Sequence, residues 1–153
     1  MSYVNSVLQP GETIKAIGKL HWIIFLRAFV LLAVGIVLLV YAETLSTQLG
    51  RLVQLIGWAS LVLGVVALLH AWFVRWITEL AITNYRVIYK RGFLRRRTVE
   101  MNMNKVETID VEQSVLGRLL GFGTIRVRGT GQGIENLRQV AAPLELRSAI
   151  TAR

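Results

Sequence analysis

Apolar positions in the first half of the chain form two long runs. Residues 23–42 contain a single charge, Arg27, and residues 52–74 contain none. Twenty helical residues extend for about 30 Å, which is the thickness of the hydrocarbon core of a bilayer. The pattern therefore predicts two transmembrane helices, at about residues 22–42 and 52–76, joined as a hairpin. Amphipathic rings, which favour the headgroup zone, stand near the ends of both runs: Trp22, Tyr41, Trp72 and Trp76.

The first apolar run also has a feature of a secretory signal, because Val40-Tyr41-Ala42 resembles a small-residue cleavage site. The run is longer than the roughly 7–15 residues of a signal core, however, and a second apolar run follows it. We therefore expect the first run to stay in the protein as a membrane span.

Cations on either side of the two runs predict the orientation of the hairpin. The connecting residues 43–51 carry one glutamate and one arginine, whereas the outer flanks are basic. Because positive charge is retained on the cytoplasmic side of a membrane, we expect both termini to be cytoplasmic. Arg27 lies close enough to that face to extend its guanidinium to the headgroups. The flanking cations are Lys15, Lys19, Arg75, Arg86, Lys90 and Arg91.

Small residues recur on one face of each predicted helix. In the first helix they are seven residues apart, and in the second they repeat at spacings of three and four. Small residues let helix backbones approach closely in lipid, where no hydrophobic drive acts between helices. We expect the two faces to pack against each other within the hairpin, and a contact between copies is the alternative. The helix-packing residues are Ala28, Gly35 and Ala42, then Gly57, Ser60, Gly64, Ala67 and Ala71.

From residue 77 onward the hydrophobic period changes from helical to alternating, with turn residues at short intervals. Turns are expected at Asn84 and at Arg91-Gly92. Ser114 and Gly121 are the expected start and stop of a short helical turn, and Pro143 opens a final short helix. The predicted strands are 77–83, 85–90, 93–102, 106–113 and 124–128, with further strand pieces in 134–142.

These elements predict an α+β fold for the soluble part of a membrane protein. The antiparallel strands would form a small curled sheet or partial barrel, capped by the C-terminal helix. The expected organisation is a cytoplasmic N-terminal segment at residues 1–20, a transmembrane helical hairpin at 21–76 and a cytoplasmic module at 77–153.

A resemblance to a known family is carried by residues 80–131, whose sequence is LAITNYRVIYKRGFLRRRTVEMNMNKVETIDVEQSVLGRLLGFGTIRVRGTG. This stretch is similar to the bacterial pleckstrin-homology (PH) domain family, once described as a membrane-flanked domain of unknown function. The most specific pieces are TNYRVIYKRG and KVETIDVEQSVLGRLLGFGTI, together with the preceding pair of apolar runs. The resemblance covers about residues 75–150 and implies a seven-stranded bent sheet closed by a C-terminal helix, in a protein of the bacterial inner membrane.

The resemblance implies no binding or catalytic site, because that family has no agreed ligand and no catalytic residues. One departure from it is the Arg95-Arg96-Arg97 triplet, which is more basic than in a typical member.

The segment Lys90–Glu100, KRGFLRRRTVE, holds five cations in its first eight positions. A hairpin at Asn84 would return the first two cations to the headgroups, with Arg95 at the limit of electrostatic range. Arg97 would lie about 17 Å along the next strand. The alternative is an edge strand whose charges only fix topology and solubility. The candidate residues for binding anionic lipid or a partner are Lys90, Arg91, Arg95 and Arg96.

Composition argues against several classes of function. The chain is 54% hydrophobic with a net charge of +9, a combination typical of a protein at an anionic membrane face. Cysteine is absent, and both histidines, His21 and His70, lie in or beside the apolar runs, so the module offers neither a thiolate nor a histidine base. No aromatic stacking platform for nucleic acid accompanies the arginines. We expect no enzyme activity, no metal, no cofactor and no nucleic-acid partner.

Three functions are compatible with these features. We favour a membrane-anchored, non-catalytic PH-like module that binds or scaffolds at the cytoplasmic face, in contact with anionic lipid headgroups or a protein partner. The second is a structural subunit of a larger homo- or hetero-oligomeric membrane assembly. The third is a small transporter or channel component with a path around Arg27 and His70.

Overall fold

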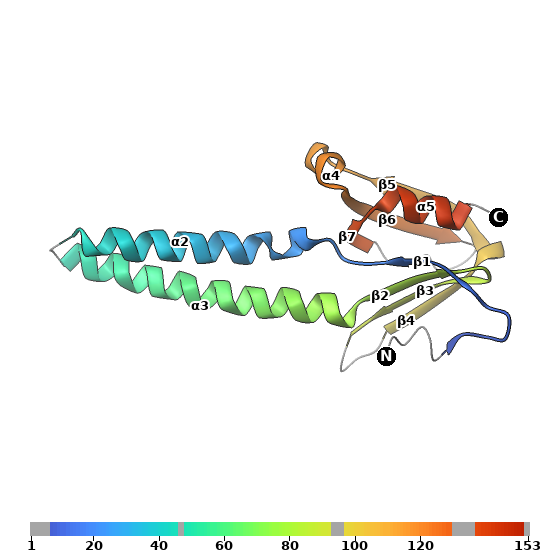
Figure 1. The fold of residues 1–153 in the computed structure, drawn as a ribbon, viewed down its shortest axis with the longest axis horizontal. Helices are drawn as coiled ribbons and strands as arrows, with labels where there is room; N and C mark the ends of the chain where they lie inside the picture. The colour runs from blue at the N-terminus through green and yellow to red at the C-terminus, as the bar shows by residue number, and fades with distance from the viewer. Residues whose placement is uncertain (1–6, 46–47, 93–96, 130–136, 152–153) are drawn as a thin grey trace. The chain divides into compact units, whose positions relative to one another are not determined.

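The computed structural model describes residues 7–45, 48–92, 97–129 and 137–151 of the chain. The chain divides into two compact units, Trp22–Val74 and a second unit that combines Met1–His21 with Arg75–Arg153. We refer to the first as the helical unit and to the second as the domain. Figure 1 shows two long helices in the helical unit, and two sheets with helix α5 in the domain.

The helical unit consists of a short 3-10 helix, η1 (Trp22–Phe25), followed by α2 (Leu26–Glu43) and α3 (Gln48–Ile77), whose last residues belong to the domain. Both long helices have the length and apolar composition needed to cross a membrane. Only 11% of the apolar window in each helix is buried. Large apolar side chains therefore point away from the helix pair, and Val37 and Leu55 are each 65% exposed.

Small residues fill the contact between α2 and α3. All of the helix-packing residues named from the sequence are buried except Ala67, which is half-buried. A Cβ atom added at Gly35 would lie 2.7 Å from the side chain of Leu61 on the other helix. The hydroxyl of Ser60 donates a hydrogen bond to the carbonyl of Leu31 (2.8 Å), again across the helix pair. The two small-residue faces thus meet inside the hairpin.

The domain contains two antiparallel sheets, with strand orders β1-β2-β3-β4 and β5-β6-β7. Helix α4 connects β5 to β6, and α5 follows β7 (Figure 1). The described residues have the α+β arrangement that the alternating pattern predicted and the seven strands that the resemblance implied. The strands are divided between two sheets, however, and do not form the single bent sheet that was expected. The bounds are β1 Ile14–Gly18, β2 Glu79–Thr83, β3 Arg86–Arg91, β4 Arg97–Asn102, η2 Met103–Lys105, β5 Val106–Glu112, α4 Val115–Leu120, β6 Phe122–Gly129, β7 Leu137–Ala141 and α5 Pro143–Thr151.

Strand β1 comes from residues that precede the helical unit. The sequence predicts a separate segment at residues 1–20, but in the structure β1 pairs with β2, with Gly18 opposite Leu80. The chain then pairs with β7, because the backbone N–H of His21 donates to the carbonyl of Gln139 (2.7 Å). One segment therefore joins the two sheets, and the domain takes strands from both sides of the helical unit.

The core of the domain is shared by the two sheets and α5. In β6, buried and less buried residues alternate, as the two-residue period of a strand requires. Helix α5 contributes Leu146 and Ile150 to the same cluster, so it covers the sheets as predicted. The buried core residues are Leu80, Ile82, Val87, Tyr89, Met101, Ile125, Val127, Leu137, Val140, Leu146 and Ile150.

The domain has two opposite ends, which differ in whether the chain connects there to the helical unit. At one end β1 finishes and β2 begins, and the chain passes to and from the helical unit after His21 and before Arg75; we call this the junction end. A bridge between Leu20 and Val140 brings the end of β7, and with it the start of β6, to the same end. The opposite, distal end holds η2 and the β2–β3 turn at Asn84.

Candidate functional site

The strand ends at the junction end hold Lys90 and Arg91, the first two cations of the segment Lys90–Glu100, which we call the basic run. Strands β2 and β3 form a hairpin in which Glu79 lies opposite Lys90. Helix α3 ends at Ile77, just before Glu79, so Lys90 lies near the place where the chain leaves α3. The hairpin at Asn84 thus returns the chain to this end, as the sequence predicted.

Arg97 also lies at the junction end, which corrects a prediction from the sequence. A tight turn at Arg91-Gly92 would have left Arg97 about 17 Å along the next strand. In the structure Arg91 still belongs to β3 and pairs with Arg97, the first residue of β4. The connection begins instead at Gly92, whose φ of 101° is a left-handed conformation that suits glycine.

The structure therefore fixes the backbone positions of only part of the predicted binding set. Arg95 and Arg96 lie outside the described residues, as do the side chains of Arg91 and Arg97, and Lys90 is half-buried. Strand register brings Lys90, Arg91 and Arg97 to one end of the sheet. Cations on adjacent strand ends favour an anionic partner.

A buried ion pair holds the residues before β1 against the distal end. The carboxylate of Glu12 accepts hydrogen bonds from the guanidinium of Arg86 (two, each 3.0 Å) and from the hydroxyl of Thr83 (2.7 Å). Arg86 also donates to Glu100 (2.7 Å). Burial alone would raise the pKa of Glu12, but the hydrogen bonds it accepts, chiefly from Arg86, and the positive charge of Arg86 lower it from 4.5 to about 2. Arg86, one of the flanking cations named from the sequence, is thus neutralised within the domain.

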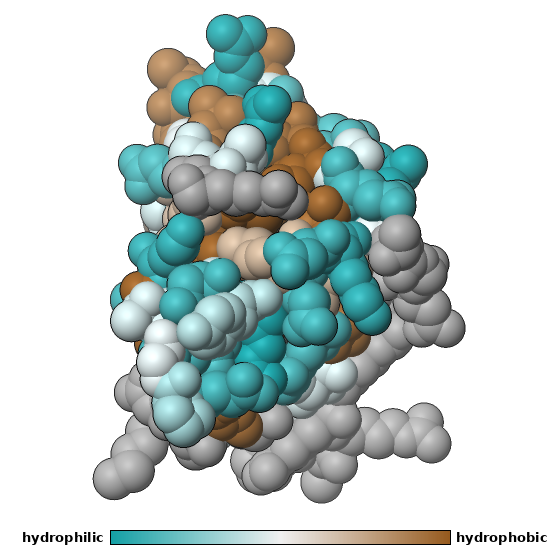
Figure 2. Space-filling view, turned by 90° about the vertical axis from the view of Figure 1, so that its right-hand side faces the viewer, coloured by the Kyte–Doolittle hydropathy of each residue, from teal (hydrophilic) through white to brown (hydrophobic). Residues whose placement is uncertain are grey.

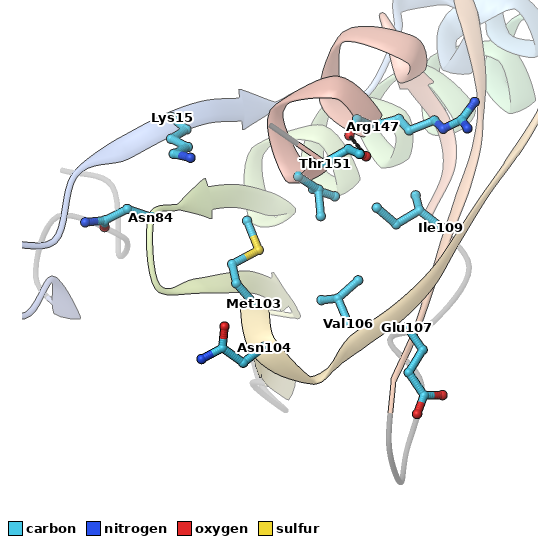
Figure 3. A pocket seen from close by; sticks show the side chains of 10 residues that line it. Lys15, Asn84, Met103, Asn104, Val106, Glu107, Ile109, Arg147 and Thr151 are labelled. Atoms are coloured by element: carbon cyan, nitrogen blue, oxygen red, sulfur yellow. Dashed lines mark hydrogen bonds between the residues drawn. The ribbon is translucent and has the colours of Figure 1, made fainter. Parts of the chain in front are cut away.

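A cleft of about 580 Å³ opens at the distal end of the domain. Its walls come from β1, the β2–β3 turn, η2, β5 and the last residues of α5 (Figure 3). Met103, Val106 and Ile109 supply apolar surface in its middle. Figure 2 looks onto this end and shows hydrophilic residues over much of the surface, with an apolar area among them. The polar lining residues are Lys15, Asn84, Asn104, Glu107, Arg147 and Thr151.

Both signs of charge and two amides line this cleft, so its chemistry suits a polar ligand or a peptide segment. Asn84 is held in place, because its side chain accepts from the N–H of Thr13 (2.9 Å) and donates to the carbonyl of Gly11 (3.2 Å). Among the described residues, no group of three or more His, Cys, Asp or Glu could hold a metal ion. The lining residues come from five separate elements, so no local sequence pattern marked the cleft.

Comparison with known protein families gives a match over most of the chain. A sequence model of the family described as Bacterial PH domain matches residues 19–153. A search of curated proteins found no match, and neither did a search of solved structures. The matched range includes both apolar helices and every described strand of the domain except β1. Since it spans most of the chain, the protein belongs to the bacterial PH domain family.

Proposed function

We propose that the protein is a membrane-anchored PH-like binding module that faces the bacterial cytoplasm. The observation that supports membrane anchoring is the outward apolar surface of α2 and α3. Only 11% of the most apolar stretch of each helix is buried. In water an apolar surface of this size leads to association, whereas the hydrocarbon of a bilayer solvates it. Helices also satisfy their own backbone hydrogen bonds, which a span in lipid requires.

Apolar helices of this length also occur in the cores of soluble proteins and in secretory signals, but α2 and α3 fit neither class well. A core helix of a soluble protein is mostly covered by its own chain, which α2 and α3 are not. A secretory signal is removed, yet α2 packs closely on α3: a Cβ atom added at Gly57 would lie 2.9 Å from the side chain of Leu39. Such close contact supports two helices that remain together.

Contact with anionic lipid headgroups is supported by the register of the basic run. Lys90, Arg91 and Arg97 are at the end of the domain where the chain leaves α3. Each cation close to an anionic leaflet gains about 1 kcal/mol, and the gain fades over a Debye length of about 8 Å. Arg95 and Arg96, which lie outside the described residues, stand between Arg91 and Arg97 in the sequence and would add to this attraction.

A scaffold role for the domain is supported by its family and by the distal cleft. PH domains are generally binding modules without catalytic activity, and the cleft offers polar groups to a second partner. A subunit of a larger membrane assembly is the alternative. It draws little support from the small residues, because Gly35 and Gly57 already contact leucines within the hairpin. A transport function around Arg27 and His70 would require several copies.

Anchoring is tested by extraction of the full chain from membranes. We expect it to remain in the membrane fraction after an alkaline carbonate wash and to be released by detergent. Release by carbonate alone would show that α2 and α3 do not span a bilayer, and the proposal would then fail.

Orientation is tested by labelling single cysteines, for which this cysteine-free chain is well suited. Thr44→Cys probes the α2–α3 connection, and Ser148→Cys probes an exposed position on α5. A membrane-impermeant maleimide should label the first in intact spheroplasts and the second only after permeabilisation. The opposite result would place the domain outside the cytoplasm.

A further inference from the structure

Helix α4 presents a large apolar surface that the domain does not cover. In a water-facing domain, contiguous side chains of this kind mark a contact with another apolar phase. We call this surface the α4 apolar face. It comprises four of the six residues of α4: Val115 (85% exposed), Leu116 (65%), Leu119 (81%) and Leu120 (40%).

Specific contacts hold both ends and the centre of α4, so its orientation relative to β6 of the same domain is fixed. Ser114 caps the helix, since its hydroxyl accepts from the N–H of Gly117 (3.0 Å), and Gly121 ends it in a left-handed conformation. Gly117 is buried, and a Cβ atom there would lie 2.6 Å from the carbonyl oxygen of Phe122. The helix backbone therefore lies tightly on the start of β6 at Gly117, while its four large side chains remain exposed.

The α4 apolar face belongs to the junction end. The ring of Phe122, which directly follows the C-cap of α4, contacts the ring of His21, with centroids 5.3 Å apart. The carbonyl of Gly121 accepts from the N–H of Ala142 (2.9 Å), at the end of β7. Trp22, the residue after His21, is the first residue of the helical unit. The chain therefore enters the apolar helices next to the C-terminus of α4.

We propose that the α4 apolar face inserts into the interface of the bilayer that α2 and α3 cross, as a third and peripheral membrane contact. This inference rests on the proposed function. Short amphipathic helices bind at the boundary between headgroups and acyl chains, with apolar residues inward and cations at the headgroups. Arg118, exposed in the middle of α4, supplies such a cation.

A lipid surface is favoured over a protein partner by position and charge together. His21, which contacts Phe122 beside the C-terminus of α4, is covalently joined to Trp22, so the start of the apolar helices is tethered close to α4 whatever else the domain binds. The basic strand ends of β3 and β4 are at the same end and favour the anionic surface that Arg118 would meet. A second copy of the chain, or another protein, is left as an outcome of the test.

The test places an environment-sensitive fluorophore on single cysteines of the full chain in lipid nanodiscs. Leu119→Cys probes the α4 apolar face, Asn104→Cys is the control at the distal end, and Val62→Cys lies on the exposed apolar surface of α3. Lipids brominated high on the acyl chain should quench the Leu119→Cys probe at least twofold more than the Asn104→Cys probe. Iodide, which stays in the water, should quench the Asn104→Cys probe more than the Leu119→Cys probe.

The three probes separate the inference from the function on which it rests. If lipids brominated deep in the chain quench Val62→Cys and no brominated lipid quenches Leu119→Cys, the inference is overturned and the anchoring stands. If Val62→Cys is not quenched by lipid either, the anchoring itself is refuted. Protection of Leu119→Cys from iodide without quenching by lipid would mean that a second protein copy covers α4, which also overturns the inference.

Discussion

In the helical unit the buried positions are small, as at Gly35 and Ser60, and the large apolar side chains point outward. In the core of the domain the arrangement is reversed, because large apolar residues such as Ile82 and Val87 are fully buried. Large apolar residues are therefore exposed in one region of the chain and buried in the other. Burial of apolar area stabilises the domain in water. Under the proposed anchoring, lipid gives the helix pair no such drive, and close approach of the backbones stabilises it instead. The helical unit and the domain should accordingly lose stability in response to different substitutions.

The largest effect is expected from separating the two regions. A fragment of residues 75–153 lacks β1, so β2 loses its pairing partner on one side. The side chains of Leu80 and Ile82 in the core then become more exposed to water. We expect this fragment to aggregate. A linked variant, in which a short Gly/Ser linker replaces residues 22–76, should fold and stay soluble without detergent, because Gly18 already lies opposite Leu80.

Circular dichroism and two-dimensional NMR of the two proteins would measure this difference. If the fragment without β1 gave the same dispersed spectrum and melting temperature as the linked variant, β1 would not be part of the domain's stable fold. If the linked variant required detergent, the contrast between the two regions would be wrong.

The next effect concerns the small-residue contact in the helical unit. Gly57→Leu introduces a side chain where even a Cβ atom would lie 2.9 Å from Leu39, so we expect about 1–3 kcal/mol of destabilisation. Ala59→Leu places the same side chain at an exposed position on α3 and should cost almost nothing. Thermal loss of helical circular dichroism in detergent measures both. Equal melting temperatures for the two variants would contradict close packing as the source of stability.

A smaller effect is expected from acid, and only in the domain. The pKa of Glu12 is lowered from 4.5 to about 2, so the charged carboxylate contributes stability that is fully present above pH 4.5. That contribution is lost as the pH falls through about 2, when the folded state also binds the proton. Denaturant unfolding of the linked variant should therefore show stability that declines over this range.

The control for this prediction is Glu12→Gln, which keeps the size of the side chain and removes its titration. We expect that variant to be less stable at neutral pH and to show a shallower decline in acid. A decline of unchanged steepness would assign the acid sensitivity to other carboxylates.

The smallest effect per substitution is expected at the basic strand ends. Reversing Lys90, Arg91 and Arg97 to Glu should remove about 1 kcal/mol of headgroup attraction per cation at low salt. Native mass spectrometry of the full chain in mixed-lipid nanodiscs would measure this as loss of retained phosphatidylglycerol. Lys105→Glu at the distal end is the control, and its retained lipid should match the wild type. Equal loss in both variants would refute a specific headgroup contact.

Local signals in the sequence were sufficient for much of the fold. The cap at Ser114 and the left-handed stop at Gly121 were predicted because each is determined by the residue itself and its near neighbours. The alternation that predicted β6 is equally local, since every second residue of that strand is buried from Gly123 to Val127.

Non-local pairings could not be predicted in the same way. β1 is five residues long and pairs with a strand beyond the whole helical unit, so nothing near it in sequence indicates its partner. Glu12 and Arg86 are 74 residues apart, and each by itself has the pattern of a solvated surface charge. Arg97 was misplaced because the alternating pattern gives no register, whereas its position is set by pairing with Arg91 on β3.

The position of β1 has a consequence for how the protein is made. β1 leaves the ribosome before either long helix, yet its partner strand is synthesised only after α3. Until then β1 is an unpaired strand, and its short length and Lys15 protect it from pairing with other chains. Formation of the helix pair, in which Gly64 of α3 packs on Leu32 of α2, then brings the two ends of the helical unit toward each other, which lowers the entropic cost of closing the long loop between β1 and β2. Under the proposed anchoring, insertion of the hairpin thus prepares the last step of domain folding, and a variant that delays insertion should accumulate nascent chains with an incomplete sheet.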